Sequence, residues 1–446
     1  MTRTTFLVLV ALATLAGVML GPARARAHSG IQSYIYVSTL GSSVDGRVEY
    51  PVGDLAEVLG VELGTGSTAA AELAAGHADA IRAYTDDHLA FADGDGDWSL
   101  SFTEDVDVLP VAGNYIVVPF EVEQRFDAAP RSFRVEFDGI IHAEPERDAL
   151  LVIENDWGTA RFANEAGHLV GFSVGMTSQA IELDDVGALT SMRAVRGLGT
   201  DAVRTAIQHL LFAVAILTPV ALLTKGGSVG GAAPTVSAAT RRAATLLAAS
   251  AVAHSVVMWT LVVAGIDASG DAVGVLVAAS LGAMAVYGLW RFTERELLVV
   301  VALSAVQGIG FAGDFVGRRL DQIDTPLALI AFNIGMEVAV VVTALLVFPL
   351  LLLVRRTALA AAALYGVTAV ICLYSAAWMI ARTGLADLDD DRAANPLRMW
   401  PRNLLLMLLA LAAAGVLFAW TAQRDRLRAV ETHGGVPEED REMVAT

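Results

Sequence analysis

Long apolar runs dominate the second half of the chain. Several of them lie between residues 203 and 421, and each is close to the roughly 20 residues that one helical crossing of a bilayer needs. Only 17% of all residues are charged, against about 25% in soluble proteins. We therefore predict a polytopic α-helical membrane bundle over residues 197–421. Its expected helices, about seven in number, are 203–224, 243–266, 272–290, 297–316, 326–354, 357–383 and 403–421.

The chain begins with the pattern of an export signal. Arg3 precedes an apolar stretch, and Ala25-Arg26-Ala27 offers small residues at the positions that signal peptidase reads. The apolar stretch is short for an uncleaved anchor helix, which is the alternative. We predict a signal peptide over residues 1–27.

Basic residues in the connections between the apolar runs predict the orientation of the bundle. With the amino-terminal part outside, most of them fall on the cytoplasmic side, as the positive-inside rule requires. The exception is Arg318-Arg319, which this count places outside. We predict a cytoplasmic tail over 422–446. The cytoplasmic basic residues by this count are Lys225, Arg241, Arg242, Arg291, Arg295, Arg355, Arg356, Arg424, Arg426 and Arg428.

Residues 28–196 read as an exported acidic domain. This segment holds 29 Asp and Glu residues against 9 Lys and Arg, which suits solubility or the accumulation of cations and excludes a basic surface for nucleic acid. Alternating apolar and polar residues predict strands, and an alanine-rich segment predicts a helix from Ala69 to Phe91. We expect a small β-rich sandwich. The strands are expected at Ile31–Val37, Tyr115–Glu123, Ser132–Asp138 and Leu150–Glu154, with turns at Asp45-Gly46, Asp138-Gly139 and Trp157-Gly158.

One acidic segment in this domain has the spacing of a calcium loop. Asp93, Asp95, Asp97 and Glu104 occupy positions 1, 3, 5 and 12 of the pattern that an EF-hand uses. Trp98 stands where that loop needs glycine, and the following residues do not resemble an exiting helix. A solvated acidic turn is the favoured interpretation.

A few polar side chains interrupt the apolar runs. They are Gln208 and His209 in the first run, His254 and Ser255 in the second, Gln307 in the fourth, and Asn333 and Glu337 in the fifth. Such groups are costly in lipid and mark function, although they also serve as hydrogen-bonding contacts between helices. A buried Glu337 needs a cation, a proton or a histidine partner.

These blocks resemble the HupE/UreJ family of hydrogenase- and urease-accessory membrane proteins. The resemblance implies a nickel or cobalt permease in the prokaryotic plasma membrane, with no enzyme activity and no cofactor other than the transported ion. It also implies that His209, His254, Glu337 and Asn333 bind the metal, with Gln208, Ser255 and Gln307 as further polar lining. The matching blocks are Leu198-Gly199 to His209-Leu210-Leu211-Phe212, His254-Ser255, Gly308-Ile309-Gly310-Phe311-Ala312, Phe332-Asn333-Ile334-Gly335-Met336-Glu337, and Asp54-Leu55 with Leu59-Gly60.

The chain departs from the family pattern at several metal-ligand positions. Ala202, Gln208 and Gln307 stand where the family has His, Asp and His, and Ala339-Val340 replaces Gly-Gln. Nickel and cobalt favour imidazole and carboxylate donors, so these changes weaken or alter the site.

Three hypotheses follow from these residues. The first is a divalent-metal permease with an altered site. The second is a non-transporting module whose helices anchor an exported domain that binds an envelope or metalloenzyme-maturation partner. The third, an intramembrane enzyme using His254 and Ser255, is disfavoured because adjacent helical residues point about 100° apart.

Overall fold

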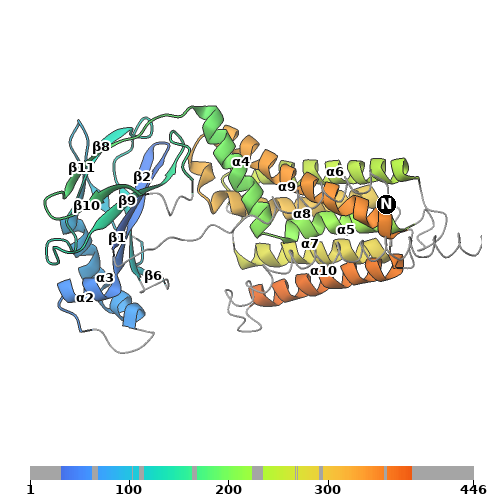
Figure 1. Cartoon of the computed structure of the whole chain (residues 1–446), viewed down its shortest axis with the longest axis horizontal. Helices are drawn as coiled ribbons and strands as arrows, with labels where there is room; N and C mark the ends of the chain where they lie inside the picture. The colour runs from blue at the N-terminus through green and yellow to red at the C-terminus, as the bar shows by residue number, and fades with distance from the viewer. Residues whose placement is uncertain are drawn as a thin grey trace, which may run out of the picture. The chain divides into compact units, whose positions relative to one another are not determined.

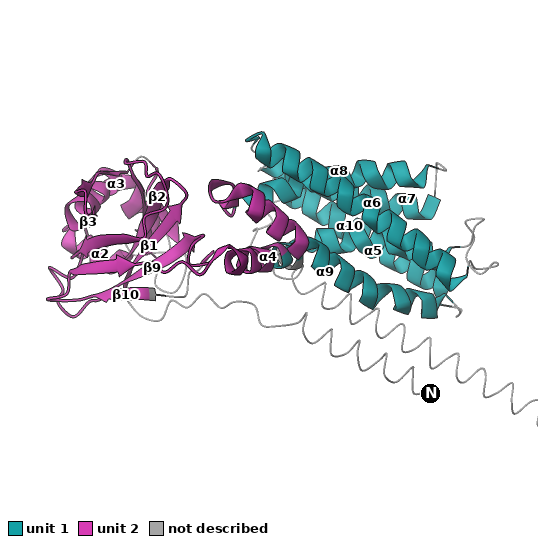
Figure 2. Cartoon of the chain, turned by 90° about the horizontal axis from the view of Figure 1, so that it is seen from above, with its two compact units in different colours: residues 1–21, 200–317, 336–446 teal, residues 22–199, 318–335 magenta. Residues whose placement is uncertain are grey.

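A computed structural model describes residues 32–62, 69–102, 104–109, 115–162, 168–223, 235–266, 268, 270–290, 295–355 and 359–383. The described chain forms two compact units (Figures 1 and 2). One comprises the described residues up to Gly199 together with 318–335, and the other comprises 200–317 and the residues from Met336 onward. The predicted signal peptide, the helix expected at 403–421 and the tail 422–446 lie outside the described residues.

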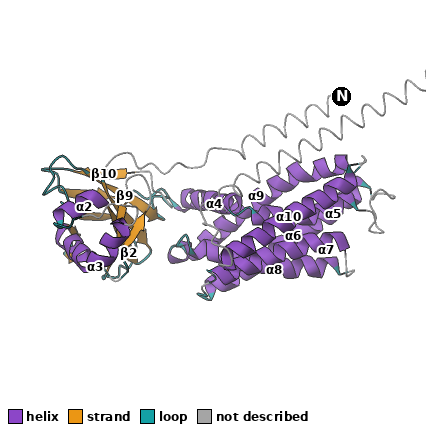
Figure 3. Cartoon of the chain, turned by 90° about the horizontal axis from the view of Figure 1, so that it is seen from below, coloured by secondary structure: helices purple, strands orange, loops and turns teal. Residues whose placement is uncertain are grey.

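The first unit is built on two β-sheets (Figure 3). Its larger sheet has the order β10-β9-β1-β2-β7-β5 with β6 also paired to β7, and its smaller sheet has the order β11-β8-β3-β4. The pairing of β1 with β9 is parallel, and the other pairs are antiparallel. The strands are β1 Ser33–Leu40, β2 Ser43–Pro51, β3 Leu89–Ala92, β4 Asp97–Trp98, β5 Leu100–Ser101, β6 Asp107–Leu109, β7 Tyr115–Val122, β8 Ser132–Phe137, β9 Ala149–Asp156, β10 His168–Phe172 and β11 Ser178–Glu182.

Apolar residues from both sheets share one core. The alternation that predicted β8 is visible in its burial, since Phe133, Val135 and Phe137 are buried while the residues between them are exposed. The expected β-rich architecture is therefore confirmed. The turn expected at Asp45-Gly46 was wrong, because these residues pair with Val37 and Ser38 inside the β1–β2 hairpin. Gly46 has no Cβ to collide with the carbonyl oxygen of Tyr36, so it is needed for close packing rather than for a turn.

Helices α2 Val52–Val58 and α3 Ala69–His88 accompany the sheets in this unit, and the first part of α4 Ala188–Thr205, up to Gly199, also belongs to it. The helix expected from Ala69 ends three residues earlier than Phe91, because Leu89 to Ala92 form β3 instead. Leu73 and Ile81 of α3 are buried in the shared core. The alanine content located the helix, and strand pairing with β8 decided its end.

Five helices are long and apolar enough to cross a membrane, within the residues that the structure describes. A sixth crossing is formed if α4 and α5, which meet at 68°, count as one bent span. The seven predicted spans are therefore not confirmed, and the five or six apolar helices make the chain a multi-pass membrane protein. The helices are α5 Gln208–Leu222, α6 Val236–Val263, α7 Asp271–Trp290, α8 Glu296–Val316, α9 Thr325–Val354 and α10 Ala360–Thr383, with a short 3-10 helix η1 Leu320–Gln322.

Glycine lets two of these helices approach closely. A Cβ on Gly308 of α8 would lie 2.5 Å from the carbonyl oxygen of His254 and 2.9 Å from its Cα on α6. Close approach of this kind is how helices associate in lipid, where burial of apolar surface gives no net driving force. Ser304 Oγ and Ser250 Oγ add a hydrogen bond of 2.8 Å across the same contact.

Candidate metal centre

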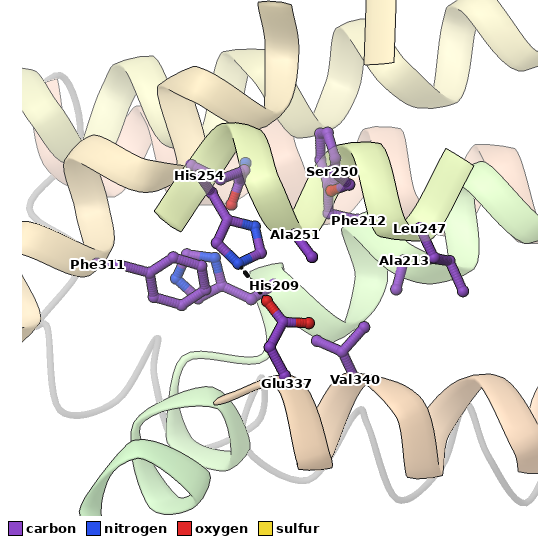
Figure 4. A pocket seen from close by; sticks show the side chains of 11 residues that line it. His209, Phe212, Ala213, Leu247, Ser250, Ala251, His254, Phe311, Glu337 and Val340 are labelled. Carbon is purple, nitrogen blue, oxygen red and sulfur yellow. Dashed lines mark hydrogen bonds and ion pairs between the residues drawn. The ribbon is translucent and has the colours of Figure 1, made fainter. Parts of the chain in front are cut away.

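Polar side chains from four helices line a small pocket inside the membrane unit (Figure 4). They come from α5, α6, α8 and α9, which are separated in the sequence by predominantly apolar residues. The lining residues are His209, Phe212, Ala213, Leu247, Ser250, Ala251, His254, Gln307, Phe311, Glu337 and Val340.

His254 and Glu337 are in direct contact in this pocket. His254 Nε2 lies 2.7 Å from Glu337 Oε1, and Figure 4 shows the carboxylate directed at the imidazole ring. The His254 side chain is 6% exposed and that of Glu337 is 28% exposed. The histidine partner that an intramembrane Glu337 requires is therefore His254.

His209 enters the pocket with an uncommitted nitrogen. Its ring stacks on Phe311 with 3.7 Å between centroids, and Phe311 also meets the His254 ring edge-to-face at 5.1 Å. His209 Nδ1 is buried and makes no hydrogen bond within the described residues. Buried polar atoms in proteins nearly always have a partner, and the neighbour that interacts with the His209 ring is the Gln307 side chain, so a ligand at Nδ1 would share it with Gln307.

Gln307 presents a second uncommitted atom to the same pocket. Its amide nitrogen donates hydrogen bonds to Ser280 Oγ at 2.7 Å and to the Val277 carbonyl oxygen at 3.1 Å. Its Oε1 is buried without a hydrogen-bond partner in the described residues. The two donated bonds fix the amide orientation, so the oxygen and not the nitrogen is the atom left for His209 or for a ligand.

Local folding explains why His209 reaches the pocket. The first helix expected, 203–224, is interrupted near its start. The chain breaks after Thr205, and both residues begin α5, where the His209 backbone N–H bonds to the Ala206 carbonyl oxygen at 3.2 Å. The break turns the helix, so that Gln208 faces α10, where Tyr374 Oη donates to its Oε1 at 3.5 Å.

The remaining predicted site residues are not among those that line the pocket. Ser255 follows His254 on α6 and is half-buried, while Asn333 lies on α9 one turn before Glu337 and is also half-buried. The pocket in turn includes Phe311 and Ser250, to which sequence reasoning gave no role. Ser250 lies four residues before His254, so helical spacing alone places the two on one face.

The acidic segment expected to resemble a calcium loop is part of a β-hairpin. Phe91 pairs with Trp98 and Ala92 with Asp97, and the Asp93 side chain accepts a hydrogen bond of 2.8 Å from the backbone N–H of Asp95. Glu104 is exposed beyond β5, and its carbonyl oxygen accepts a hydrogen bond from Arg82. Calcium binding by these carboxylates stays a prediction.

Comparison with known families gives one match. Residues 177–382 match the family model described as HupE / UreJ protein. This range contains α4 to α9, all but the last residue of α10, and every residue that lines the pocket. No curated protein and no solved structure matches the chain.

Proposed function

We propose that this membrane unit, whose residues 177–382 match the HupE / UreJ family model, moves a divalent transition-metal ion, nickel or cobalt, across a prokaryotic plasma membrane. The observation that carries the proposal is the pair His254–Glu337 in the same pocket as the buried imidazole of His209. Two imidazoles and a carboxylate form a donor set that suits these ions.

The chemistry of the pocket supports cation binding and release. The Glu337 carboxylate compensates part of the ion's charge, which an apolar helix bundle cannot do. The uncharged Gln307 oxygen and the phenyl ring of Phe311 complete the wall without adding charge. A site with one carboxylate holds a divalent ion less tightly than one with several, and a transported ion has to leave its site.

Uptake of radioactive nickel or cobalt by cells that express the chain tests the proposal. Glu337→Gln and His254→Ala each remove one donor and are expected to reduce uptake at least about ten-fold, since metal affinity falls about 10- to 100-fold even when only an outer partner of a ligand is lost. Thr343→Val is the matched control. It removes a polar group from the same helix, where Thr343 Oγ1 bonds only to its own helix at Ala339 O, 2.9 Å away.

Uptake that stays at the wild-type level in a Glu337→Ala, His209→Ala double variant rules out this pocket as the transport site. Protein level in the membrane is measured for every variant, so that loss of transport is separated from loss of expression.

A second candidate function is that of a membrane-anchored module that transports nothing. The observation that favours it is the loss of family ligand positions at Ala202, Gln208 and Gln307. It predicts that metal uptake is absent in wild-type cells and that the β-rich unit binds a partner in the cell envelope. An uptake signal abolished by Glu337→Gln excludes this second candidate.

A further inference from the structure

Two histidines and an aspartate come together in the β-rich unit, apart from the membrane pocket. They are His88, Asp138 and His142, and one potential ligand atom from each lies within 4.8 Å of the others. His88 is the last residue of α3, while the other two lie in the segment after β8. The three residues follow no regular sequence spacing, so the cluster cannot be recognised from a sequence motif.

Strand register brings His88 to Asp138. Antiparallel pairing of β3 with β8 sets Leu89 opposite Phe137, so the next residues outward, His88 and Asp138, face each other. The Asp138 backbone N–H bonds to the His88 carbonyl oxygen at 3.3 Å, and His88 Nδ1 lies 2.7 Å from Asp138 Oδ1. Two positions on rigid elements are therefore held in ligand range.

A tight turn supplies the third group. The His142 backbone N–H bonds to the Asp138 carbonyl oxygen at 3.0 Å, and Ile140 within the turn has a positive φ of 65°. Tyr84 Oη accepts a hydrogen bond of 2.6 Å from the Ile140 N–H, which ties the turn to α3. A non-glycine residue at positive φ is costly, and this bond helps to hold it there.

The tautomer of His142 leaves a lone pair exposed. Its Nδ1–H donates to the Asp138 carbonyl oxygen at 3.2 Å, so in the neutral ring Nε2 carries the lone pair. A backbone hydrogen bond on one ring nitrogen is the arrangement that orients metal-binding histidines. The His88 and His142 rings lie parallel, 4.3 Å apart at 9°, with Tyr84 against His88 on the inner side.

We infer that His88, Asp138 and His142 bind one divalent transition-metal ion on the β-rich unit, with water completing the coordination. Imidazole and carboxylate donors select cobalt, nickel, zinc or copper over magnesium and calcium, which take oxygen ligands. Ligand atoms around such an ion lie about 3 to 3.5 Å apart. The exposed His142 side chain can adjust slightly to close the remaining distance, and the ion takes the place of the direct contact between His88 and Asp138.

Titration of the full-length protein in detergent with Co²⁺ tests this site, because Co²⁺ absorbs visible light when nitrogen donors bind it. The measurement uses a His254→Ala, Glu337→Gln background, which removes the pocket in the membrane unit. One equivalent of Co²⁺ is expected to bind, and His142→Ala and Asp138→Asn are each expected to weaken binding about 100-fold or more.

His77→Ala is the matched control, since His77 is an exposed histidine on the same helix α3 and outside the cluster. Co²⁺ should raise the unfolding temperature of the background protein and of His77→Ala, but not of His142→Ala. His142 is exposed, so its removal leaves the fold intact without metal. Absence of Co²⁺ binding in the background, or an unchanged spectrum in His142→Ala, overturns the inference. Neither result bears on transport, which the uptake assay measures separately.

Discussion

Asp156 is a carboxylate with no exposed surface, and its partners come from three parts of the β-rich unit. Arg131 donates two hydrogen bonds at 2.7 and 3.0 Å, Thr39 Oγ1 donates one at 2.7 Å, and the Thr159 N–H donates one at 2.6 Å. Burial alone would raise the pKa of Asp156, but the hydrogen bonds from Arg131 and Thr159 outweigh it and lower the pKa. The ionised form is therefore the one that stabilises the fold.

Replacing Asp156 with Asn should destabilise the β-rich unit by about 2 to 3 kcal/mol, because the half-buried Arg131 loses a charged partner that is itself fully buried. The cost is measured from urea unfolding of the full chain followed by tryptophan fluorescence. Asp79→Asn is the control, since Asp79 is fully exposed and pairs only with Arg82 at 3.1 Å. If Asp156→Asn is as stable as Asp79→Asn, the ionised Asp156 carboxylate does not stabilise the fold as proposed.

The same carboxylate predicts a dependence of stability on pH. The folded pKa of Asp156 is below its unfolded value, so its contribution is complete above about pH 4 and is lost as the pH falls through the folded pKa. The difference in unfolding free energy between wild type and Asp156→Asn should thus be constant near neutral pH and shrink below about pH 4. If the difference in unfolding free energy between wild type and Asp156→Asn grows in acid, the ionised carboxylate is not the stabilising form.

At the scale of elements, the contact between α6 and α8 decides the geometry of the membrane pocket. Gly308 leaves no space for a side chain against His254, while Ser304 bonds to Ser250 one turn away. His254 and Gln307 are the pocket residues on these two helices. Any separation of the helices moves both donors.

Gly308→Ala should therefore displace α6 and impair metal uptake at least as strongly as loss of one donor. Gly366→Ala is the matched control, because Gly366 lies in another membrane helix, α10, with open space around its Cα. Alanine there should be neutral or stabilising by up to about 1 kcal/mol, since glycine lowers helix stability by a similar amount. Uptake and thermal stability in detergent check both variants. Equal behaviour of the two variants would show that the close approach is not required.

At the scale of the whole molecule, one ion pair bears on orientation. Arg319, in the connection between α8 and α9, donates to both carboxylate oxygens of Asp45 and also to Gln322 Oε1 at 3.0 Å. Asp45 lies in β2, and both residues belong to the same compact unit. The arginine that departed from the loop-charge pattern is thus neutralised by an acid of the β-rich unit. The pair is consistent with that unit and the α8–α9 connection sharing the outer side.

Cysteine labelling tests the orientation directly. The chain has a single cysteine, Cys372, so Cys372→Ser gives a background without thiols. In that background Asp79→Cys should react with a membrane-impermeant maleimide in spheroplasts, whose plasma membrane is intact, because the β-rich unit is expected outside. Ser237→Cys, exposed near the start of α6, should react only after lysis. The reverse pattern would invert the predicted topology.

Much of this protein could be read from the sequence, because the bilayer imposes a length and an apolar composition that local residues alone satisfy. The helices expected at 272–290, 297–316 and 326–354 agree with α7, α8 and α9 within one residue at each end. The polar groups His209, His254, Gln307 and Glu337 were also visible as interruptions of apolar runs. Their cost in lipid identifies them without any knowledge of their neighbours.

What the tertiary structure decided is which of these groups meet. Helical spacing put Asn333 and Glu337 on one face, but only the packing of α6 against α8 and α9 places His254 against Glu337 and excludes Ser255 from the pocket lining. The break before α5 and the β3–β8 register that joins His88 to Asp138 had no local signature either. Both depend on contacts between residues far apart in the chain, which composition and periodicity do not encode.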